Sequence, residues 1–210
     1  MTALSYTTGT AVKARLGIGS GDTTDDTLLG GYVNATNEWI EQYCGRQVGP
    51  VTAGTATFDA TYDASPSGRT LYIPQGIRTF SAVTVAPSTG ATGVAATTGD
   101  LVVLPRSHNR RPDWPGFELE FIDAPTGAVA TFGTGYGNIT VVGAFGWAAI
   151  PYKVAEIAEA IVVRIWHARM SGQTDIVGSD ETGAPLVTRF ISGEDRATLR
   201  DYRVHRLVAA

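Results

Sequence analysis

Residues 143–151 read Gly-Ala-Phe-Gly-Trp-Ala-Ala-Ile-Pro, and the apolar run Tyr152–Met170 follows them directly. This stretch joins a Val- and Ile-rich run, which ends at Phe145, to a segment that begins with proline. Because proline is favoured in the first turn of a helix, the stretch predicts a strand, a Gly-Trp corner and a long helix in succession. No nucleophile, metal-ligand cluster or phosphate-binding loop lies beside this junction in the sequence. The pattern therefore indicates a structural part more than a catalyst.

The helix expected over residues 152–170 has a wide apolar face. At roughly 100° per residue, its apolar side chains cover about half of the circumference. They are Val154, Ile157, Ala158, Ile161, Val162, Ile165 and Trp166, and the polar side chains opposite are Lys153, Glu156, Arg164 and His167. A face this wide packs against more than one neighbour. Either the core of the chain is large here or another subunit shares the helix, and the pattern leaves both readings open.

Helices are also expected before residue 50, and short strands between residues 51 and 145. A short helix over residues 10–16 should end at Gly17, and a longer one should run from Asp25 or Asp26 to Gly45. The middle of the chain alternates short β-like runs with Gly, Pro, Ser and Thr clusters. These runs are residues 57–63, 70–73, 81–86, 101–104, 117–122 and 138–145. They predict a small antiparallel sheet or barrel.

The expected fold class is α+β, because helices flank the β-rich zone on both sides. Residues 1–50 and 151–210 should form a helical core, in which the N-terminal helices pack with the long C-terminal helix. Residues 51–150 should form an inserted antiparallel β-module. After the long helix, residues 171–188 are expected to form a polar loop. Residues 192–195, Ser-Gly-Glu-Asp, then fit a capping box for a last helix. That helix should carry Arg196, Arg200, Arg203 and Arg206.

Composition narrows the possible functions. The 210 residues are 43% hydrophobic, enough to bury a core. A net charge of −4 argues against electrostatic wrapping of a nucleic acid but permits passive contact with DNA. Cys44 is the single cysteine, so neither an internal disulfide nor a cysteine-based zinc site is possible. Neither a signal peptide nor an apolar run of about 20 residues is recognisable, so we expect folding in a reducing cytoplasm without membrane insertion.

Several short motifs have simple structural interpretations. Residues 17–21, Gly-Ile-Gly-Ser-Gly, fit a helix stop, and residues 133–137, Gly-Thr-Gly-Tyr-Gly, fit a hairpin tip better than a nucleotide loop. The carboxylates of Asp22, Asp25 and Asp26 suit helix capping. Cys44 fits a buried structural thiol. The three histidines are too scattered in the sequence for a metal-binding pattern, so we expect no metal and no cofactor.

One group of carboxylates permits a catalytic interpretation. Asp113, Glu118, Glu120 and Asp123 contain a possible acid/base pair for sugar hydrolysis, with Trp114 as a sugar platform. The solvent-facing side of a strand explains acidic residues more simply. We therefore expect that the chain is not an enzyme and has no catalytic residues.

Interface candidates come from four places in the sequence. The Pro-rich segment 106–115 concentrates arginine and tryptophan, which are over-represented among interface anchors. It suits a contact loop, for protein or for DNA phosphate, and a solvated turn equally well. The segment 178–190 favours recognition, since it lies in a long loop between helices. With the long helix and the last helix, the candidates are Arg106, Arg110, Arg111, Trp114, Ile161, Ile165, Trp166, Arg189, Phe190, Arg196, Arg200 and Arg203.

The order of these segments resembles the head-to-tail connector (adaptor) proteins of long-tailed bacteriophages, in particular the actinobacteriophage-like ones. Three stretches carry the resemblance: the early helix, residues 25–46; the strand and corner, residues 137–151; and the helix from Val154 to Trp166. Each stretch is an apolar pattern with a turn signal. The resemblance lies in their order and spacing, and it covers nearly the whole chain.

The resemblance implies a structural virion protein of the neck, between capsid and tail, which assembles in the host cytoplasm. Such an adaptor docks on the portal protein, forms a homo-oligomeric ring, expected to have twelve copies, and extends the DNA channel. It offers a platform for the next neck component, a stopper or tail terminator. Residues 171–210 would face the portal, and the β-module would be peripheral or tailward. The alternative is a virion carbohydrate- or receptor-binding β-module.

Overall fold

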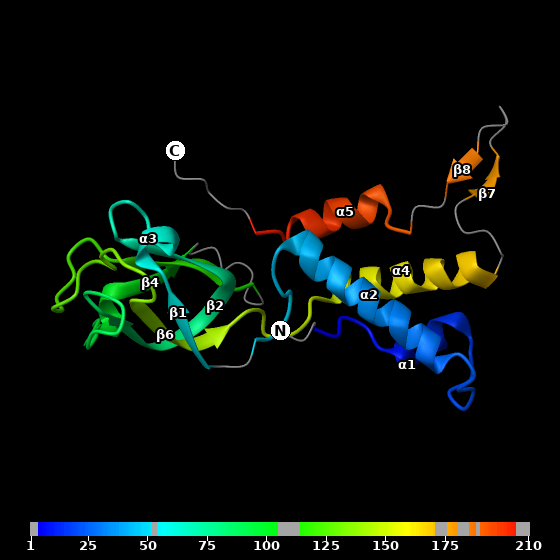
Figure 1. Cartoon of the computed structure of the whole chain (residues 1–210), viewed down its shortest axis with the longest axis horizontal. Helices are drawn as coiled ribbons and strands as arrows, with labels where there is room; N and C mark the ends of the chain where they lie inside the picture. The colour runs from blue at the N-terminus through cyan, green and yellow to red at the C-terminus, as the bar shows by residue number, and fades with distance from the viewer. Residues whose placement is uncertain are drawn as a thin grey trace. The chain divides into compact units, whose positions relative to one another are not determined.

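The computed structural model of the chain describes residues 4–51, 54–104, 114–170, 176–179, 185–187 and 190–204 (Figure 1). These residues divide into two compact units. One is drawn from Met1–Val48 with Ile150–Val204, and the other from Gly49–Ala149. We call them the helical unit and the β unit. The combination of helices with an antiparallel sheet confirms the expected α+β class. The division into a helical core of residues 1–50 and 151–210 and an inserted β-rich module of residues 51–150 stays a prediction.

The helical unit contains four helices and a short hairpin. The helices are α1 (Gly9–Leu16), α2 (Asp26–Cys44), α4 (Tyr152–Met170) and α5 (Gly193–Arg200). Glycines in the left-handed conformation end the first two, Gly17 with a φ of 71° and Gly45 with a φ of 69°. The N-terminal cap of α2 differs from expectation. Asp25 occupies the cap position without a side-chain cap bond, and Asp26 instead pairs with the buried Lys13 of α1.

The core of the helical unit forms where α1, α2 and α4 meet. Trp166 of α4, only 7% exposed, packs with Val12 of α1 and with Leu29 and Val33 of α2. Ile161 of α4 is also buried, at 2% exposure. The wide apolar face of α4 is therefore largely covered within the chain itself. Cys44 is buried as expected, and burial raises the pKa of its thiol to about 11.

The β unit is built on a six-stranded antiparallel sheet. Its elements are β1 (Gly54–Phe58), α3 (Ala60–Asp63), β2 (Thr70–Val85), β3 (Val94–Ala95), the 3-10 helix η1 (Thr98–Asp100), β4 (Leu101–Leu104), β5 (Gly116–Phe121) and β6 (Ile139–Phe145). The strand order is β1-β6-β2-β5-β4, with β3 paired to the end of β2. Alternate side chains such as Leu119, Phe121, Ile139 and Val141 are buried on one face and form a core with Phe132.

Four expectations about this region and the long loop were wrong. Residues 57–63 are the end of β1 followed by α3, and residues 70–73 and 81–85 belong to the single strand β2. Residues 133–137 lie in the connection between β5 and β6, which both pair with β2, so they form no hairpin tip. The expected loop 171–188 contains a hairpin of β7 (Ile176–Ser179) and β8 (Pro185–Val187).

The length of β2 has a physical reason. Its register shifts between Tyr72 and Ile77, so that one strand pairs first with β5 and then with β6. Gly76 lies in this shift with a φ of 78°, and a Cβ there would come within 2.6 Å of Pro115 Cγ. A strand that bends at glycine can continue where the sequence pattern shows an interruption.

The Gly-Trp corner lies at the end of β6, as expected. Gly146 has a φ of 69°, and Trp147 beside it is 1% exposed. The ring of Trp147 contacts those of Trp114 and Phe117, with centroids 6.0 and 5.9 Å away. Its backbone N–H donates to the carbonyl of Gly49 at 3.0 Å. The corner therefore closes the β unit around a buried indole.

We predict that Gly146→Ala lowers the free energy of unfolding by about 2 kcal/mol. An alanine Cβ would lie 2.4 Å from the carbonyl oxygen of Gly49, in a backbone conformation that L-residues rarely adopt. Urea unfolding of the full chain measures the change. Gly21→Ala is the matched control, since nothing lies within 4 Å of that position. If the two variants were equally stable, the described backbone conformation and close packing at Gly146 would be wrong.

Candidate protein interface

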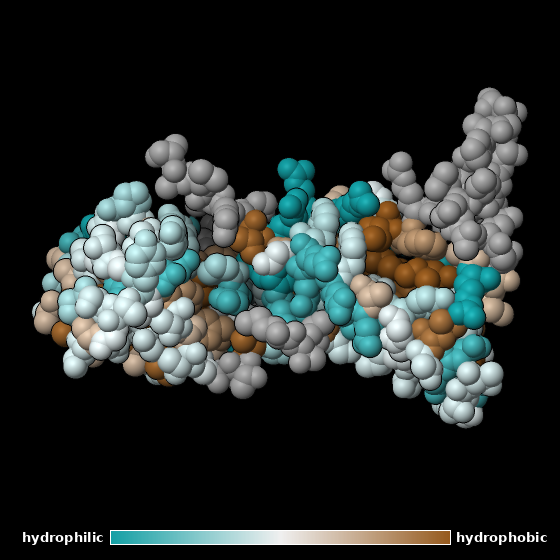
Figure 2. Space-filling view, in the orientation of Figure 1, coloured by the Kyte–Doolittle hydropathy of each residue, from teal (hydrophilic) through white to brown (hydrophobic). Residues whose placement is uncertain are grey.

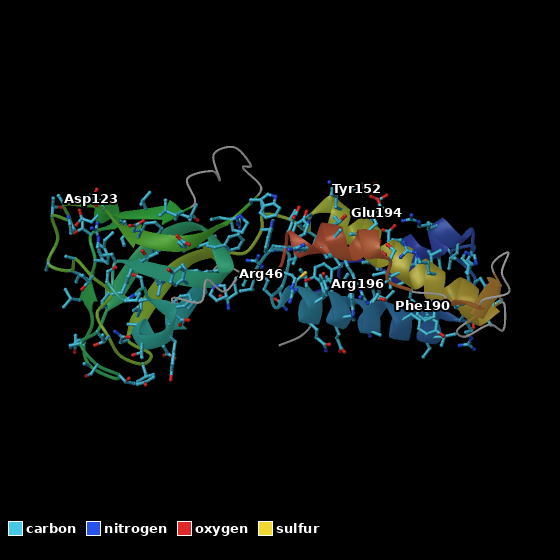
Figure 3. All side chains as sticks on the ribbon, turned by 90° about the horizontal axis from the view of Figure 1, so that it is seen from above. Arg46, Asp123, Tyr152, Phe190, Glu194 and Arg196 are labelled. Carbon is cyan, nitrogen blue, oxygen red and sulfur yellow. The ribbon has the colours of Figure 1, made fainter. Side chains whose placement is uncertain are left out.

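The described carboxylates among those considered for catalysis lie along β5 and just beyond its end. Glu118 and Glu120 lie two residues apart on β5, on one face of the sheet. Partial burial, and then the charge of Glu120, raise the pKa of Glu118. Asp123 lies beyond the strand and pairs with Arg69 at 3.1 Å (Figure 3). Asp113 is outside the described residues. The arrangement is that of a charged sheet face.

The described residues contain neither a cluster of metal ligands nor a membrane-spanning helix. Within the described ranges, no three His, Cys, Asp or Glu side chains gather closely enough to hold a metal ion. In the same ranges, none of the helices has the length and apolar character that a bilayer crossing requires.

Helix α5 is fastened to α4 at its N-terminus. The expected capping box is present: Ser192 N–H donates to the Asp195 carboxylate at 2.8 Å, and Asp195 N–H donates to Ser192 Oγ at 3.0 Å. Arg164 of α4 forms an ion pair with Asp195 and donates to the carbonyl of Phe190 at 2.9 Å. Burial alone would raise the pKa of Asp195, but the bonds from Arg164 and Ser192 outweigh it and lower that pKa. The start of α5 is therefore fixed by charge-assisted bonds.

The other end of α5 leads into a segment held by the C-terminal corner of α2. Arg46 donates to the carbonyls of Tyr202 and Arg203, both at 2.7 Å, and Val204 N–H donates to the carbonyl of Cys44 at 2.9 Å. The Arg203 guanidinium lies 5.2 Å from the ring centroid of Tyr43, a cation–π contact. We call residues 202–204 the strap. Arg46 thus fixes the path of the strap along α2.

A shallow groove lies on the helical unit where α1, α4 and α5 meet. Its volume is about 410 Å³. Basic and acidic side chains line it together: Arg15, Lys153 and Arg164 with Glu156, Glu194 and Asp195. Tyr152, which precedes the groove residue Lys153 in the chain, is 78% exposed. A groove with both charge signs suits a protein partner with complementary charges.

The structure places the expected interface residues in three situations. Arg196 and Arg200 are exposed on α5. Arg203 is exposed on the strap, so the expectation that the last helix carries it was wrong, since α5 ends at Arg200. Trp166 and Ile161 are buried in the core of the chain, while Ile165, Trp114 and Phe190 are half-buried. The remaining candidates, Arg106, Arg110, Arg111 and Arg189, lie outside the described residues, as does Arg206. Direct contact of all these residues with a partner stays a prediction.

Sequence reasoning missed Arg46 and the groove. Arg46 follows the helix-ending Gly45, where a basic residue looks like an ordinary C-terminal charge. Its two backbone acceptors lie more than 150 residues further along the chain, and no local pattern announces such a bond. The groove combines side chains from three helices. Of the groove residues, only Glu194 could have been placed from the sequence, because the capping box locates the first turn of the last helix.

We predict that Arg46→Met releases the strap. The variant loses both hydrogen bonds to the strap carbonyls, which we expect to cost about 1–2 kcal/mol, and it leaves the chain near Arg203 open to trypsin. Limited proteolysis followed by mass spectrometry measures the cleavage rate after Arg203. Arg15→Met is the matched control, because Arg15 makes only a surface ion pair with Glu159. Unchanged cleavage after Arg203 in the Arg46 variant would contradict the role of Arg46.

Comparison with known proteins gives matches at the level of structure. No protein-family model and no curated protein matches the sequence. A chain from the neck of an empty gene transfer agent (GTA) particle, computed with C6 symmetry, has a TM-score of 0.54 and 16% identity, covering 100% of this chain and 93% of that one. A chain from the neck of a native GTA particle, computed with C12 symmetry, has a TM-score of 0.50 and 17% identity, covering 100% and 99%. At these identities the comparisons show a shared fold.

Proposed function

We propose that this chain is a structural protein of the neck of a phage-like particle, with no enzymatic role. The observation that carries the proposal is the shared fold, which extends over 100% of this chain and nearly all of each matched neck chain. A fold shared over the full length includes both the helical unit and the β unit. The resemblance of the sequence to head-to-tail adaptors supports the same role independently of those structures.

We also propose that the protein acts as a ring, of twelve copies, docked on the portal. Ring subunits contact each other head to tail, so each needs two different complementary surfaces. The groove of α1, α4 and α5 offers one, since it presents side chains of both charge signs. The symmetric necks that contain the matched chains support a cyclic assembly. The next neck component, a stopper or tail terminator, would bind the opposite end of the ring.

The portal-facing surface is proposed to be α5 with the strap. Arg196, Arg200 and Arg203 are exposed there, while Asp195 and Arg46 hold the backbone in place. Side chains presented on a fixed backbone lose less conformational entropy on binding.

The net charge of −4 would let DNA pass through the ring without strong binding to its phosphates. Residues 51–150 would form an inserted, peripheral or tailward domain.

The portal-facing surface is tested by recruitment to DNA-filled heads. Deletion of residues 191–210 should abolish recruitment, and the double variant Arg196→Glu, Arg200→Glu should reduce it about tenfold or more. Co-sedimentation of the purified chain with heads measures the bound fraction. Arg169→Glu, an exposed charge reversal at the end of α4, is the control and should bind normally. Normal recruitment of the deletion variant would overturn this assignment.

A further inference from the structure

The β unit carries a pair of exposed tyrosines that its core does not explain. Tyr62 of α3 is 73% exposed and Tyr136, in the connection before β6, is 55% exposed. Their ring centroids are 5.6 Å apart and their planes meet at 59°. The two residues are far apart in the sequence, so the fold brings them together at the surface. Neither ring gains the stability that burial of an aromatic side chain provides.

The backbone around Tyr136 is built to present this ring. Tyr136 lies between Gly135, with a φ of 142°, and Gly137, with a φ of 56°. Thr61, next to Tyr62, forms two hydrogen bonds with this segment. Its N–H donates to the carbonyl of Gly135 at 3.1 Å, and its hydroxyl accepts from Gly135 N–H at 3.1 Å. These reciprocal bonds fix the two tyrosines relative to each other.

A buried amide extends the support to a third segment. Asn138 is 2% exposed, and its Oδ1 accepts from Ala60 N–H at 3.1 Å, at the start of α3. Its Nδ2 donates to the carbonyls of Ala86 and Phe132, at 3.2 and 3.4 Å. The Thr89 hydroxyl donates to the carbonyl of Tyr136. The surface formed by Tyr62, Tyr136 and these supports is therefore ordered before any ligand arrives.

The chemistry of this surface restricts its ligand. The segments 54–68, 86–100 and 124–138 contain no lysine and no arginine, whereas Asp59 and Asp63 flank Tyr62. A phosphate- or sulfate-rich ligand would find no cation there. The surface over α3 is pale to teal in Figure 2, so the exposed apolar area around the tyrosines is small. A stable protein interface buries about 1,200 Å² or more, with a larger apolar centre.

We propose that Tyr62 and Tyr136 form a binding platform for a neutral oligosaccharide. The negative faces of the two rings attract the C–H groups of a pyranose, and their inclination allows both rings to contact one chain of sugars. Thr61, Thr89 and the tyrosine hydroxyls supply donors and acceptors for sugar hydroxyls. This ligand class matches what the surface offers, two aromatic faces among uncharged hydroxyls and carboxylates. The platform is separate from Trp114, which contacts the buried Trp147.

The protonation of the platform agrees with this ligand. A hydrogen bond with Tyr62, together with the nearby charges of Tyr62 and Asp59, raises the pKa of Tyr136. A tyrosine hydroxyl is protonated at neutral pH, where that of Tyr136 both donates and accepts hydrogen bonds. A phenolate would only accept them.

Calorimetric titration of the full chain with three hexasaccharides tests the platform. The probes are maltohexaose, cellohexaose and N-acetylchitohexaose, with heparin as the anionic control. We expect saturable binding of at least one neutral probe and none of heparin. The double variant Tyr62→Ser, Tyr136→Ser should weaken that binding about tenfold or more, because aromatic contacts carry it. Trp114→Ala should bind like the wild type. Thermal unfolding checks that the variants remain folded, as the exposure of both tyrosines predicts.

Three results would overturn the proposal: absence of binding for all neutral probes, equal binding by the double variant, or self-association that the tyrosine substitutions remove. The last result would assign the tyrosines to contact with a second copy. Recruitment of the double variant to heads separates this proposal from the neck function. If the double variant is recruited normally but no longer binds sugar, both proposals are supported. If the double variant is not recruited and the wild type binds no sugar, only the platform proposal is overturned.

Discussion

Trp166→Ala is expected to lower the free energy of unfolding by about 3–5 kcal/mol, a large part of the 5–15 kcal/mol typical of a folded domain. Trp166 is buried at the meeting of α1, α2 and α4, against Val12, Leu29 and Val33. Alanine leaves a cavity that three helices would have to close together. Urea unfolding followed by circular dichroism measures the loss. Because α4 positions Arg164, we also expect weaker assembly on heads.

A second tryptophan provides the control for this prediction. Trp39 of α2 is half-buried and stacks on Tyr43, with centroids 5.2 Å apart. Trp39→Ala should cost clearly less than Trp166→Ala, because water already reaches part of the ring. If Trp166→Ala cost less than about 1 kcal/mol, or no more than Trp39→Ala, the described core of the helical unit would be wrong.

Asp195→Ala is expected to cost about 2–3 kcal/mol and to detach the start of α5. The substitution removes the charge partner of Arg164 and leaves Ser192 N–H without its acceptor. The Arg164 side chain is 36% exposed and can regain water, so the cost should stay below that of a fully buried pair. Hydrogen exchange of the α5 amides measures the local opening. Recruitment to heads should fall with it.

The pH dependence gives an independent check. The folded pKa of Asp195 is lower than the unfolded one, so its contribution is fully present above the unfolded pKa, about 4. This contribution is lost as the pH falls through the folded pKa. The difference in stability between wild type and Asp195→Ala should therefore be constant near neutral pH and shrink below about pH 4. Asp201→Ala is the control, since Asp201 is exposed at the other end of α5.

A stability difference that stayed unchanged down to pH 2 would show that Asp195 does not act through its charge. Equal protection of the α5 amides in Asp195→Ala and Asp201→Ala would likewise contradict the fastening of α5 to α4. The two measurements report different contributions: the pH dependence reports the charge of Asp195, and hydrogen exchange reports the local opening of α5.

The sequence predicted those elements whose signals are local. A proline start and an apolar period located α4 over Tyr152–Met170, and Ser192 with Asp195 predicted the start of α5. Glycine stops likewise located the ends of α1 and α2. In each case the signal lies within one turn of the element it defines, so it does not depend on distant packing.

Features that depend on distant residues could not be predicted. The bend of β2 lies at Gly76, which Pro115 approaches closely, and Arg46 binds the strap. The hairpin of β7 and β8 lies in a stretch of polar residues without clear alternation. The width of the apolar face of α4 left two interpretations open. The structure favours the chain's own core for Trp166, since α1 and α2 cover that residue.

The tyrosine platform shows the same limit at a candidate site. Tyr62 and Tyr136 each look like an ordinary surface aromatic in the sequence. In the folded chain, bonds of Asn138 and Thr61 help to bring the segments of the two tyrosines together. The glycines on either side of Tyr136 were the one local signal, and they indicated a turn without indicating what the turn presents.

The most direct test of the neck function is negative-stain imaging of the purified full chain mixed with the portal protein encoded by the same genome, beside each component alone. We predict a ring of added density on the narrow end of the portal, with twelvefold symmetry in class averages. A portal that stays bare, with the chain monomeric and folded in the same mixture, would contradict the proposed function and leave the similarity to neck chains as one of fold alone.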